Sequence, residues 1–388
     1  MLVPKLRFKE FNNEWISKKL GDTCNINPNN EVLPYEFMYI DLESVVSGRL
    51  INKKIININN APSRAKRILK QNDILFQTVR PYQMNNYFFN DIYNISVVAS
   101  TGYAQIRTKC NSKFIYYLLH TEDFQSNVEL KCTGSNYPAI NSMELSNIFI
   151  YLPSLEEQTK IANFLSLIDR KIELQEKLVE NLKLYKKGLL KKVFSNNQGW
   201  KSAKLGDLGK FYRGHSYKSI DVSQNSNDLL VLRSNNIQSN RIIFNDLQFC
   251  KKKCHSDILL QNNDIIVCMA NGSKKLVGKS AIYQNKLNKD NVTVGAFCSI
   301  FRSDLKIIPY LFQSKIYYNN LNLLLEGTNI NNLKNADLAN ITFKIPNIEE
   351  QNRIANLFTN LDKKIDFETK KLQDLKTYKK GLLQKMFI

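Results

Sequence analysis

The sequence has no apolar stretch long enough to cross a membrane. A spanning helix needs about 20 consecutive apolar residues, and no segment of the 388 residues approaches this. The first residues, Met1-Leu-Val-Pro-Lys-Leu-Arg7, also lack the apolar core and the small-residue cleavage site of a secretory signal. We therefore expect no membrane partner and a cytoplasmic location.

Residues that commonly carry catalysis or bind metals are scarce. Only three histidines occur, His120, His215 and His255, and none has the spacing of a Ser–His–Asp triad or of a metal site. Cys250 and Cys254 with His255 resemble half of a zinc site, but no second Cys/His pair lies at finger spacing. We predict reduced structural thiols, no bound metal and no catalytic residue in this chain.

Motifs for cofactor binding are also missing. Gly272-Ser-Lys-Lys-Leu-Val-Gly-Lys-Ser280 approaches a P-loop, but five residues separate the glycines where the pattern requires four. No methyltransferase signature of the [DNS]-P-P-[FYW] kind occurs. We predict that this chain binds no cofactor, and that the basic loop after a strand at 264–267 contacts DNA.

Positive charge is what the chain has in excess. Fifty-five Lys and Arg oppose 35 Asp and Glu, which gives a net charge of +20. Residues 1–152 hold 17 basic and 13 acidic side chains, and residues 195–345 hold 20 and 10. An excess spread over folded segments predicts an extended nucleic-acid surface rather than a basic tail.

The chain also contains one segment twice. Pro153-Ser-Leu-Glu-Glu-Gln158 recurs as Pro346-Asn-Ile-Glu-Glu-Gln351, at an offset of 193 residues. Leu182-Lys-Leu-Tyr-Lys-Lys-Gly-Leu-Leu190 recurs as Leu375-Lys-Thr-Tyr-Lys-Lys-Gly-Leu-Leu383 at the same offset. Variable and constant segments therefore alternate. We predict globular domains at residues 1–152 and 195–345, and long helices at 153–194 and 346–388.

Each constant segment has the pattern of a capped, coiled-coil helix. Ser154 with Glu157, and Asn347 with Glu350, have the spacing of a capping box. Seam positions then recur in steps of four and three, and eight of ten are apolar in each series. The first series is Ile161, Leu165, Ile168, Ile172, Gln175, Val179, Leu182, Lys186, Leu189 and Val193. The second is Ile354, Phe358, Leu361, Ile365, Glu368, Leu372, Leu375, Lys379, Leu382 and Met386.

Two copies of one seam most simply pair with each other. We predict two helices of about 40 residues, each roughly 60 Å long, paired antiparallel. Gly188 and Gly381 recur inside them, although glycine costs about 1 kcal/mol in a helix interior. Three explanations stay open: close backbone approach, a partner contact, or a C-cap at a frayed end.

The variable segments have a mixed α/β pattern. Strands are expected at 73–76, 94–99, 264–267 and 292–297, where short apolar runs are bounded by turn residues. Helices are expected at 113–120 and 309–318. The predicted fold class is α+β, with two globular mixed α/β domains separated by the antiparallel long helices in an internal pseudo-twofold repeat.

Two divergent domains, each followed by a copy of P-x-x-E-E-Q…I-A…D…Y-K-K-G-L-L, resemble the specificity subunits of type I restriction–modification systems. The resemblance covers essentially the whole chain. It includes Trp15 and Trp200 near the start of each half, and the turns at Gly134-Ser135 and Gly327-Thr328.

The resemblance implies a DNA-binding subunit without catalysis of its own, located in the cytoplasm of a bacterial cell and associated with the nucleoid. Each variable segment would be a target recognition domain that reads one half of a split site in double-stranded DNA, and the helices would set the spacer. The seam helices would also dock two methyltransferase subunits, and a restriction/translocase subunit can join them. S-adenosylmethionine, ATP and Mg would be bound by these partners.

Candidate DNA contacts are polar and basic residues on predicted turns, because such groups read base edges or bind phosphates. In the first half they are Arg80, Tyr82, Gln83, Ser135, Asn136 and Tyr137. In the second half they are Arg213, His215, Ser234, Asn235, Asn236, Asn271, Ser273, Lys274 and Lys275. Two other functions stay open: a coiled-coil scaffold whose charge serves protein partners, and a self-contained DNA-modifying enzyme.

Overall fold

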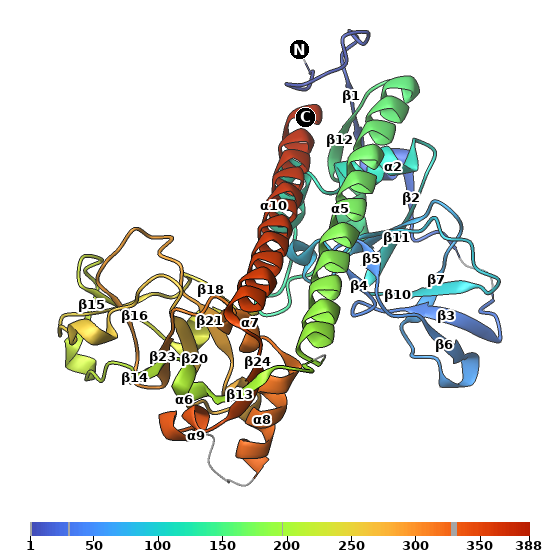
Figure 1. The fold of residues 1–388 in the computed structure, drawn as a ribbon. Helices are drawn as coiled ribbons and strands as arrows, with labels where there is room; N and C mark the ends of the chain where they lie inside the picture. Colours follow the sequence, from blue (N-terminus) through green and yellow to red (C-terminus); the bar gives the residue numbers. More distant parts are fainter. Residues whose placement is uncertain (1, 30–31, 196, 327–331) are drawn as a thin grey trace. The chain divides into compact units, whose positions relative to one another are not determined.

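The computed structural model describes residues 2–29, 32–195, 197–326 and 332–388. The chain forms two compact units (Figure 1): the first comprises Met1–Glu176 with Lys370–Ile388, and the second comprises Lys177–Thr369. Helices α5 (Leu155–Ser195) and α10 (Ile348–Met386) each contribute one part to either unit. The predicted α+β class with two long helices is confirmed. The domain boundaries stay a prediction, because the compact units divide both helices.

The start of each long helix follows from the repeated motif. The Ser154 hydroxyl accepts a hydrogen bond from the Glu157 N–H at 3.3 Å, and the Asn347 side chain accepts one from the Glu350 N–H at 2.9 Å. Both residues therefore cap their helices. The Glu157 carboxylate does not return to the cap as a capping box requires. It accepts two hydrogen bonds from Arg7, at 2.8 and 2.7 Å.

The first unit contains two four-stranded sheets, ordered β2-β11-β8-β9 and β6-β3-β10-β7. Two short pairings, β1-β12 and β4-β5, complete its strands. The strands are β1 (Ile16–Lys19), β2 (Cys24–Ile26), β3 (Glu36–Ile40), β4 (Val45–Val46), β5 (Arg49–Leu50), β6 (Lys54–Asn57), β7 (Ala65–Ile68), β8 (Ile74–Gln77), β9 (Tyr87–Phe88), β10 (Val97–Ser100), β11 (Tyr103–Thr108) and β12 (Phe149–Leu152). The short helices are α1 (Leu20–Thr23), α2 (Ser112–Leu118), α3 (Glu122–Leu130) and α4 (Ser142–Ser146), with 3-10 turns η1 (Ile58–Asn60) and η2 (Pro81–Gln83).

The second unit repeats this plan with sheets ordered β14-β23-β20-β21 and β15-β19-β16-β22, and with pairings β13-β24 and β17-β18. Its strands are β13 (Lys201–Lys204), β14 (Lys210–Arg213), β15 (Val222–Ser223), β16 (Leu229–Leu232), β17 (Ile237–Gln238), β18 (Arg241–Ile242), β19 (Gln248–Cys250), β20 (Ile265–Cys268), β21 (Ser280–Ile282), β22 (Val292–Val294), β23 (Cys298–Arg302) and β24 (Thr342–Ile345). The helices are α6 (Leu205–Leu208), α7 (Ile308–Leu311), α8 (Lys315–Glu326) and α9 (Asn335–Ala339), with 3-10 turns η3 (Ser219–Asp221), η4 (Ser234–Asn236), η5 (Ser256–Ile258) and η6 (Lys274–Leu276). The single helix predicted at 309–318 is wrong: α7 ends at Leu311, and Ser314 caps the separate α8 with its hydroxyl.

A central strand buries both of its faces in each unit. Successive strand residues point to opposite faces. In β8, Ile74 and Phe76 join the core shared with the helices, while Leu75 joins the core beneath the other sheet. In β20, Ile265 and Val267 join the helix-side core, and Ile266 joins the sheet-side core. This explains why both strands are continuous apolar runs in the sequence rather than alternating ones.

The long helices run antiparallel within each unit. In the first unit, Lys379 of α10 pairs with Asp169 of α5 at 2.6 Å. In the second unit, Lys186 of α5 pairs with Asp362 of α10, also at 2.6 Å. Each pair is the 193-residue repeat of the other, so the polar seam positions Lys186 and Lys379 are explained by ion pairing across the helices.

The repeated helix glycines have open space where a side chain would begin. A Cβ atom placed on Gly188 or Gly381 would meet no atom within 4 Å among the described residues. Close backbone approach is therefore wrong as an explanation. Both helices continue past these positions, to Ser195 and Met386, so the C-cap explanation is wrong too. A partner contact stays a prediction.

None of the described helices is both long enough and apolar enough to cross a bilayer.

Candidate nucleic-acid interface

In the first unit, two loops far apart in the sequence meet beside the end of β8. Val79 and Ala139 form an antiparallel bridge, and the Arg80 N–H donates to the Pro138 carbonyl at 2.7 Å. Arg80 has a positive φ of 53°, which turns the chain sharply into η2. The six candidates of the first half, at 80–83 and 135–137, therefore lie on two adjacent loops.

These loops present exposed aromatic and cationic groups. The Arg80 guanidinium lies 4.3 Å from the centre of the Tyr137 ring, a cation–π distance. Tyr137 is 66% exposed and Tyr82 is 53% exposed. The side-chain oxygen of Gln83 accepts a hydrogen bond from the side-chain amide of Gln77 at 2.8 Å, and this bond fixes the orientation of the Gln83 side chain. Arg80, Tyr82 and Tyr137 can thus reach a ligand as one preoriented group.

In the second unit, the corresponding loop follows β20. Ala270 bridges to Asn332, as Val79 bridges to Ala139. The Asn271 amide donates to the Ser234 hydroxyl at 3.3 Å, so the loops at 234–236 and 271–275 are joined. Lys274 and Lys275 are exposed on η6. Gly327 and Thr328, the sequence counterpart of the turn at Gly134-Ser135, lie outside the described residues.

The remaining candidates of the second unit differ in accessibility. Arg213, Asn235 and Ser273 are exposed, and the Asn235 amide donates to the Asp246 carboxylate at 2.8 Å. Asn236 is only 1% exposed, and its amide donates to the carbonyls of Ile243 and Asn245. Asn236 therefore holds the loop in place rather than facing a ligand.

His215 is also buried. It is 7% exposed, and the ring stacks on Tyr217 with centroids 6.1 Å apart. Burial, with a smaller contribution from nearby Lys252, lowers the pKa of His215. Because its ring is buried and its pKa is lowered, His215 is less suited to binding a phosphate than the exposed lysines of the 271–275 loop.

Sequence reasoning missed one exposed aromatic at this end of the sheet. Phe297 is 70% exposed, and its carbonyl accepts from the N–H groups of Met269 and Ala270. It therefore lies next to the 271–275 loop. This exposure could not be predicted, because 292–297 has the pattern of a strand in the sequence, whereas β22 ends at Val294.

The helix seam is buried within the chain. Every position of both series is buried or half-buried. These positions include Ile161, Leu165, Ile168, Ile172, Leu182, Leu189, Ile354, Phe358, Leu361, Ile365, Leu375 and Leu382. Ile161, Leu165 and Leu382 belong to the helix-side core of the first unit. Leu189, Ile354 and Phe358 pack in the helix-side core of the second unit. The large apolar residues left exposed on these helices are Leu155, Leu167, Leu174, Leu178, Leu184 and Tyr185 on α5, and Ile348, Leu357, Phe367 and Tyr378 on α10.

In the described ranges, residues of the types that bind metals do not gather into a cluster. No group of three His, Cys, Asp or Glu side chains there could hold a metal ion. Cys250 is buried in β19, and His255 forms an exposed contact with Asp257 at 3.2 Å. Residues 272–280 form the turn η6 and the start of β21 rather than the loop and helix of a P-loop.

Comparison with known proteins gives consistent matches. The type I restriction modification DNA specificity domain matches residues 12–184 and 197–377. The StySPI type I restriction enzyme specificity subunit from Salmonella potsdam is 31% identical over 185 residues, which are 46% of this chain and 39% of that protein. The MjaVIII specificity subunit from Methanocaldococcus jannaschii is 25% identical over 302 residues, or 70% of this chain and 68% of that one.

A solved structure shares the fold over the whole chain. The type I restriction–modification S subunit from M. genitalium superposes with a TM-score of 0.62 at 15% identity, covering 100% of this chain and 99% of that chain. The match to the Salmonella protein spans less than half of that relative's length.

Proposed function

Because this chain belongs to the type I restriction–modification DNA specificity family, we propose that each unit reads one half of a split site in double-stranded DNA. The observation that carries this proposal is the repeated loop after β8 and β20. In each unit it is bridged to a second distant segment, through Val79 and Ala139 or through Ala270 and Asn332. The same scaffold therefore presents two different sets of side chains, and the two half-sites should differ.

The chemistry of the loops fits base and phosphate contacts. Arg80 can donate two hydrogen bonds to a guanine edge or to a phosphate, and Tyr82 and Tyr137 offer exposed rings beside it. In the second unit, Ser234 and Asn271 offer donors and acceptors for base edges, while Lys274 and Lys275 suit phosphates.

Two methyltransferase subunits would dock on the helices, and a restriction/translocase subunit can join them. Because the seam residues are buried or half-buried, the exposed Leu178 and Tyr185 of α5 in the second unit, and the exposed Tyr378 of α10 in the first unit, offer better docking surfaces. The partners would bind S-adenosylmethionine, ATP and Mg. This chain would contribute sequence recognition and no catalytic residue.

Single-molecule mapping of methyl-adenine in cells tests the proposal. Cells with this gene and its neighbouring methyltransferase gene should show a new motif of two unlike halves around a fixed gap, absent from cells without this gene. Arg80→Ala should relax one half of the motif, and Asn271→Ala should relax the other half. Arg353→Ala, an exposed arginine on α10, should leave both unchanged. An unaltered methylome, with the complex shown to assemble, would contradict the proposal.

A further inference from the structure

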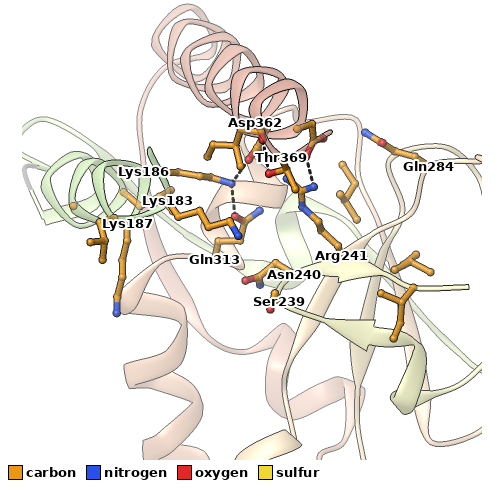
Figure 2. A pocket seen from close by; sticks show the side chains of 18 of the residues that line it. Lys183, Lys186, Lys187, Ser239, Asn240, Arg241, Gln284, Gln313, Asp362 and Thr369 are labelled. Carbon is orange, nitrogen blue, oxygen red and sulfur yellow. Dashed lines mark hydrogen bonds and ion pairs between the residues drawn. The ribbon is translucent and has the colours of Figure 1, made fainter. Parts of the chain in front are cut away.

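The second unit contains a cavity of about 1200 Å³ beside the long helices. Its walls come from residues 183–191 of α5, the β17–β18 hairpin with the chain to Phe244, the region 313–318, and residues 362–369 of α10. Apolar side chains form part of the lining: Leu184, Leu190, Ile242, Ile243, Phe244 and Ile365. Figure 2 shows Lys183 and Lys186 directed toward Gln313 at the centre of this cavity.

Cations outnumber acids in the lining. Seven are present, Lys183, Lys186, Lys187, Lys191, Arg241, Lys286 and Lys315, against Asp362 and Asp366. Lys186 pairs with Asp362, and Arg241 pairs with Asp366. In the described part of the chain, the other five lysines have no ion pair. The cavity is therefore positively charged, and part of its lining is apolar.

In the first unit, the lysines equivalent to Lys187 and Lys183 form ion pairs with glutamates. Lys380 pairs with Glu122 at 3.0 Å, and Lys376 pairs with Glu176 at 2.7 Å. Arg49 on the β4–β5 hairpin also pairs with Glu176. At the 193-residue offset, Lys187 and Lys183 replace these lysines, but Lys315 and Thr369 replace the two glutamates.

The equivalence of Glu122 and Lys315 is structural as well as sequential. Each is the first residue of its helix and follows a hydroxyl cap. Thr121 accepts from the Phe124 N–H at 3.3 Å, and Ser314 accepts from the Tyr317 N–H at 3.2 Å. A helix N-terminus favours acidic side chains and disfavours cations. Lys315 is therefore locally unfavourable, as expected of a residue kept for binding.

We propose that this cavity binds an acidic segment of a protein partner and that the first unit has no equivalent site. A DNA duplex is a broad rod whose phosphates lie on its outside, so it cannot fill a concave cavity. The apolar part of the lining fits aliphatic side chains between carboxylates, and lysine stems can cover such surfaces while their ammonium groups bind acids. The inference rests on the proposed function, which supplies a docked methyltransferase subunit as the partner. Under it, the two units differ in how they bind this subunit, because only the second unit offers the cavity.

The test measures binding of the methyltransferase subunit from the neighbouring gene to the full chain by calorimetry. Between 50 and 300 mM salt, one of the two binding steps should weaken at least tenfold and the other much less. The double variant Lys315→Glu with Thr369→Glu carries the residues of the first unit. It should weaken the salt-sensitive step at least tenfold at low salt. If that double variant fails to fold, the double variant Lys183→Gln with Lys187→Gln replaces it. It should also weaken the salt-sensitive step at least tenfold at low salt.

The opposite exchange is the matched control. Glu122→Lys with Glu176→Thr should make the other binding step salt-sensitive. Duplex DNA binding by the assembled complexes is measured in parallel. Unchanged methyltransferase affinity in the second-unit variants would overturn the inference, and a loss of DNA affinity alone would instead assign the cavity to nucleic acid. Failure of the wild-type complex to bind DNA would overturn the proposed function while the calorimetry still decides the inference.

Discussion

The first and second units share buried ion pairs but differ in what surrounds them. Asp73 accepts two hydrogen bonds from Arg107 at 2.8 and 2.7 Å, and Asp264 accepts two from Arg302 at the same distances. Both carboxylates also accept a backbone N–H, from Lys70 and Gln261. Each pair joins the start of the central strand to its neighbour, so the same sheet is fixed in both units.

The second sheets differ at their edges. Both contain a parallel pair, β3 with β10 and β16 with β22, flanked by β6 or β19. The first unit adds β7 beside β10, while the second adds β15 beside β19. The buried aspartate–arginine pair of the first sheet is therefore the same in both units. The edge strands of the second sheet, the loops and the surface charge differ between the units.

The largest effect is expected from breaking the shared ion pair. Arg107→Leu and Arg302→Leu each leave a buried aspartate uncompensated, which costs about 3–5 kcal/mol of unfolding free energy. Arg302→Leu should cost more, because Arg302 also donates to the Leu259 carbonyl at 2.8 Å. Asp73 keeps a second donor, the Gln105 amide at 2.7 Å. Denaturant unfolding followed by hydrogen exchange in each unit measures both costs; a larger loss for Arg107→Leu would contradict this comparison.

The next largest effect is a dependence of stability on pH in the first unit, which arises from His120. Burial, opposed by a hydrogen bond with the Tyr116 carbonyl, lowers the pKa of His120 to about 4. The unfolded chain, with a His pKa of about 6.5, therefore binds the proton more readily. The stability of the first unit should fall as the pH drops from about 6.5 to 4, by roughly 3 kcal/mol in total.

The second unit offers the control for this effect, because Gln313 lies at the offset of 193 from His120. His120→Gln should flatten the pH dependence of the first unit between pH 6.5 and 4.5, as measured by thermal unfolding. An unchanged slope would show that other groups cause the acid sensitivity.

A smaller effect is expected at the repeated helix-start glutamine. Gln158 and Gln351 each donate to the carbonyl of the proline five residues before, at 3.0 and 2.9 Å. Gln158 also accepts from the Asn111 N–H at 3.1 Å, whereas the Gln351 oxygen has no partner among the described residues. Gln158→Ala should cost about 2 kcal/mol and Gln351→Ala about 1 kcal/mol. Equal losses in urea unfolding would show that the Asn111 contact adds nothing.

The helices could be predicted from the sequence, because their signals are local and occur twice. The caps at Ser154 and Asn347 and the seam positions follow from spacing alone. The partners of the framework charges could not be predicted. Nothing near Asp73 identifies Arg107, and the bond between Arg7 and Glu157 joins residues 150 positions apart.

The candidate site was predicted less completely. Turn chemistry identified Arg80 and Tyr137, but only the bridge between Val79 and Ala139 brings them together. Polar residues on turns serve two purposes that the sequence does not separate. Asn236 satisfies buried carbonyls, while Asn271 stays near the surface. Exposure depends on tertiary packing, so residue type alone cannot decide between these roles.

The smallest effect tests whether the helix pairs are equivalent. Lys379 with Asp169, and Lys186 with Asp362, are half-buried pairs between antiparallel helices. A double-mutant cycle with Lys→Met and Asp→Leu should give a coupling energy of about 1 kcal/mol for each pair. Exchanging the charges, Lys186→Asp with Asp362→Lys, should recover part of the loss from either single change. Because Asp169 also accepts from the Tyr117 hydroxyl at 2.8 Å, Lys379→Met should cost less than Lys186→Met. The reverse order would mean that the tyrosine does not stabilise the carboxylate, and that the antiparallel register depends equally on both lysines.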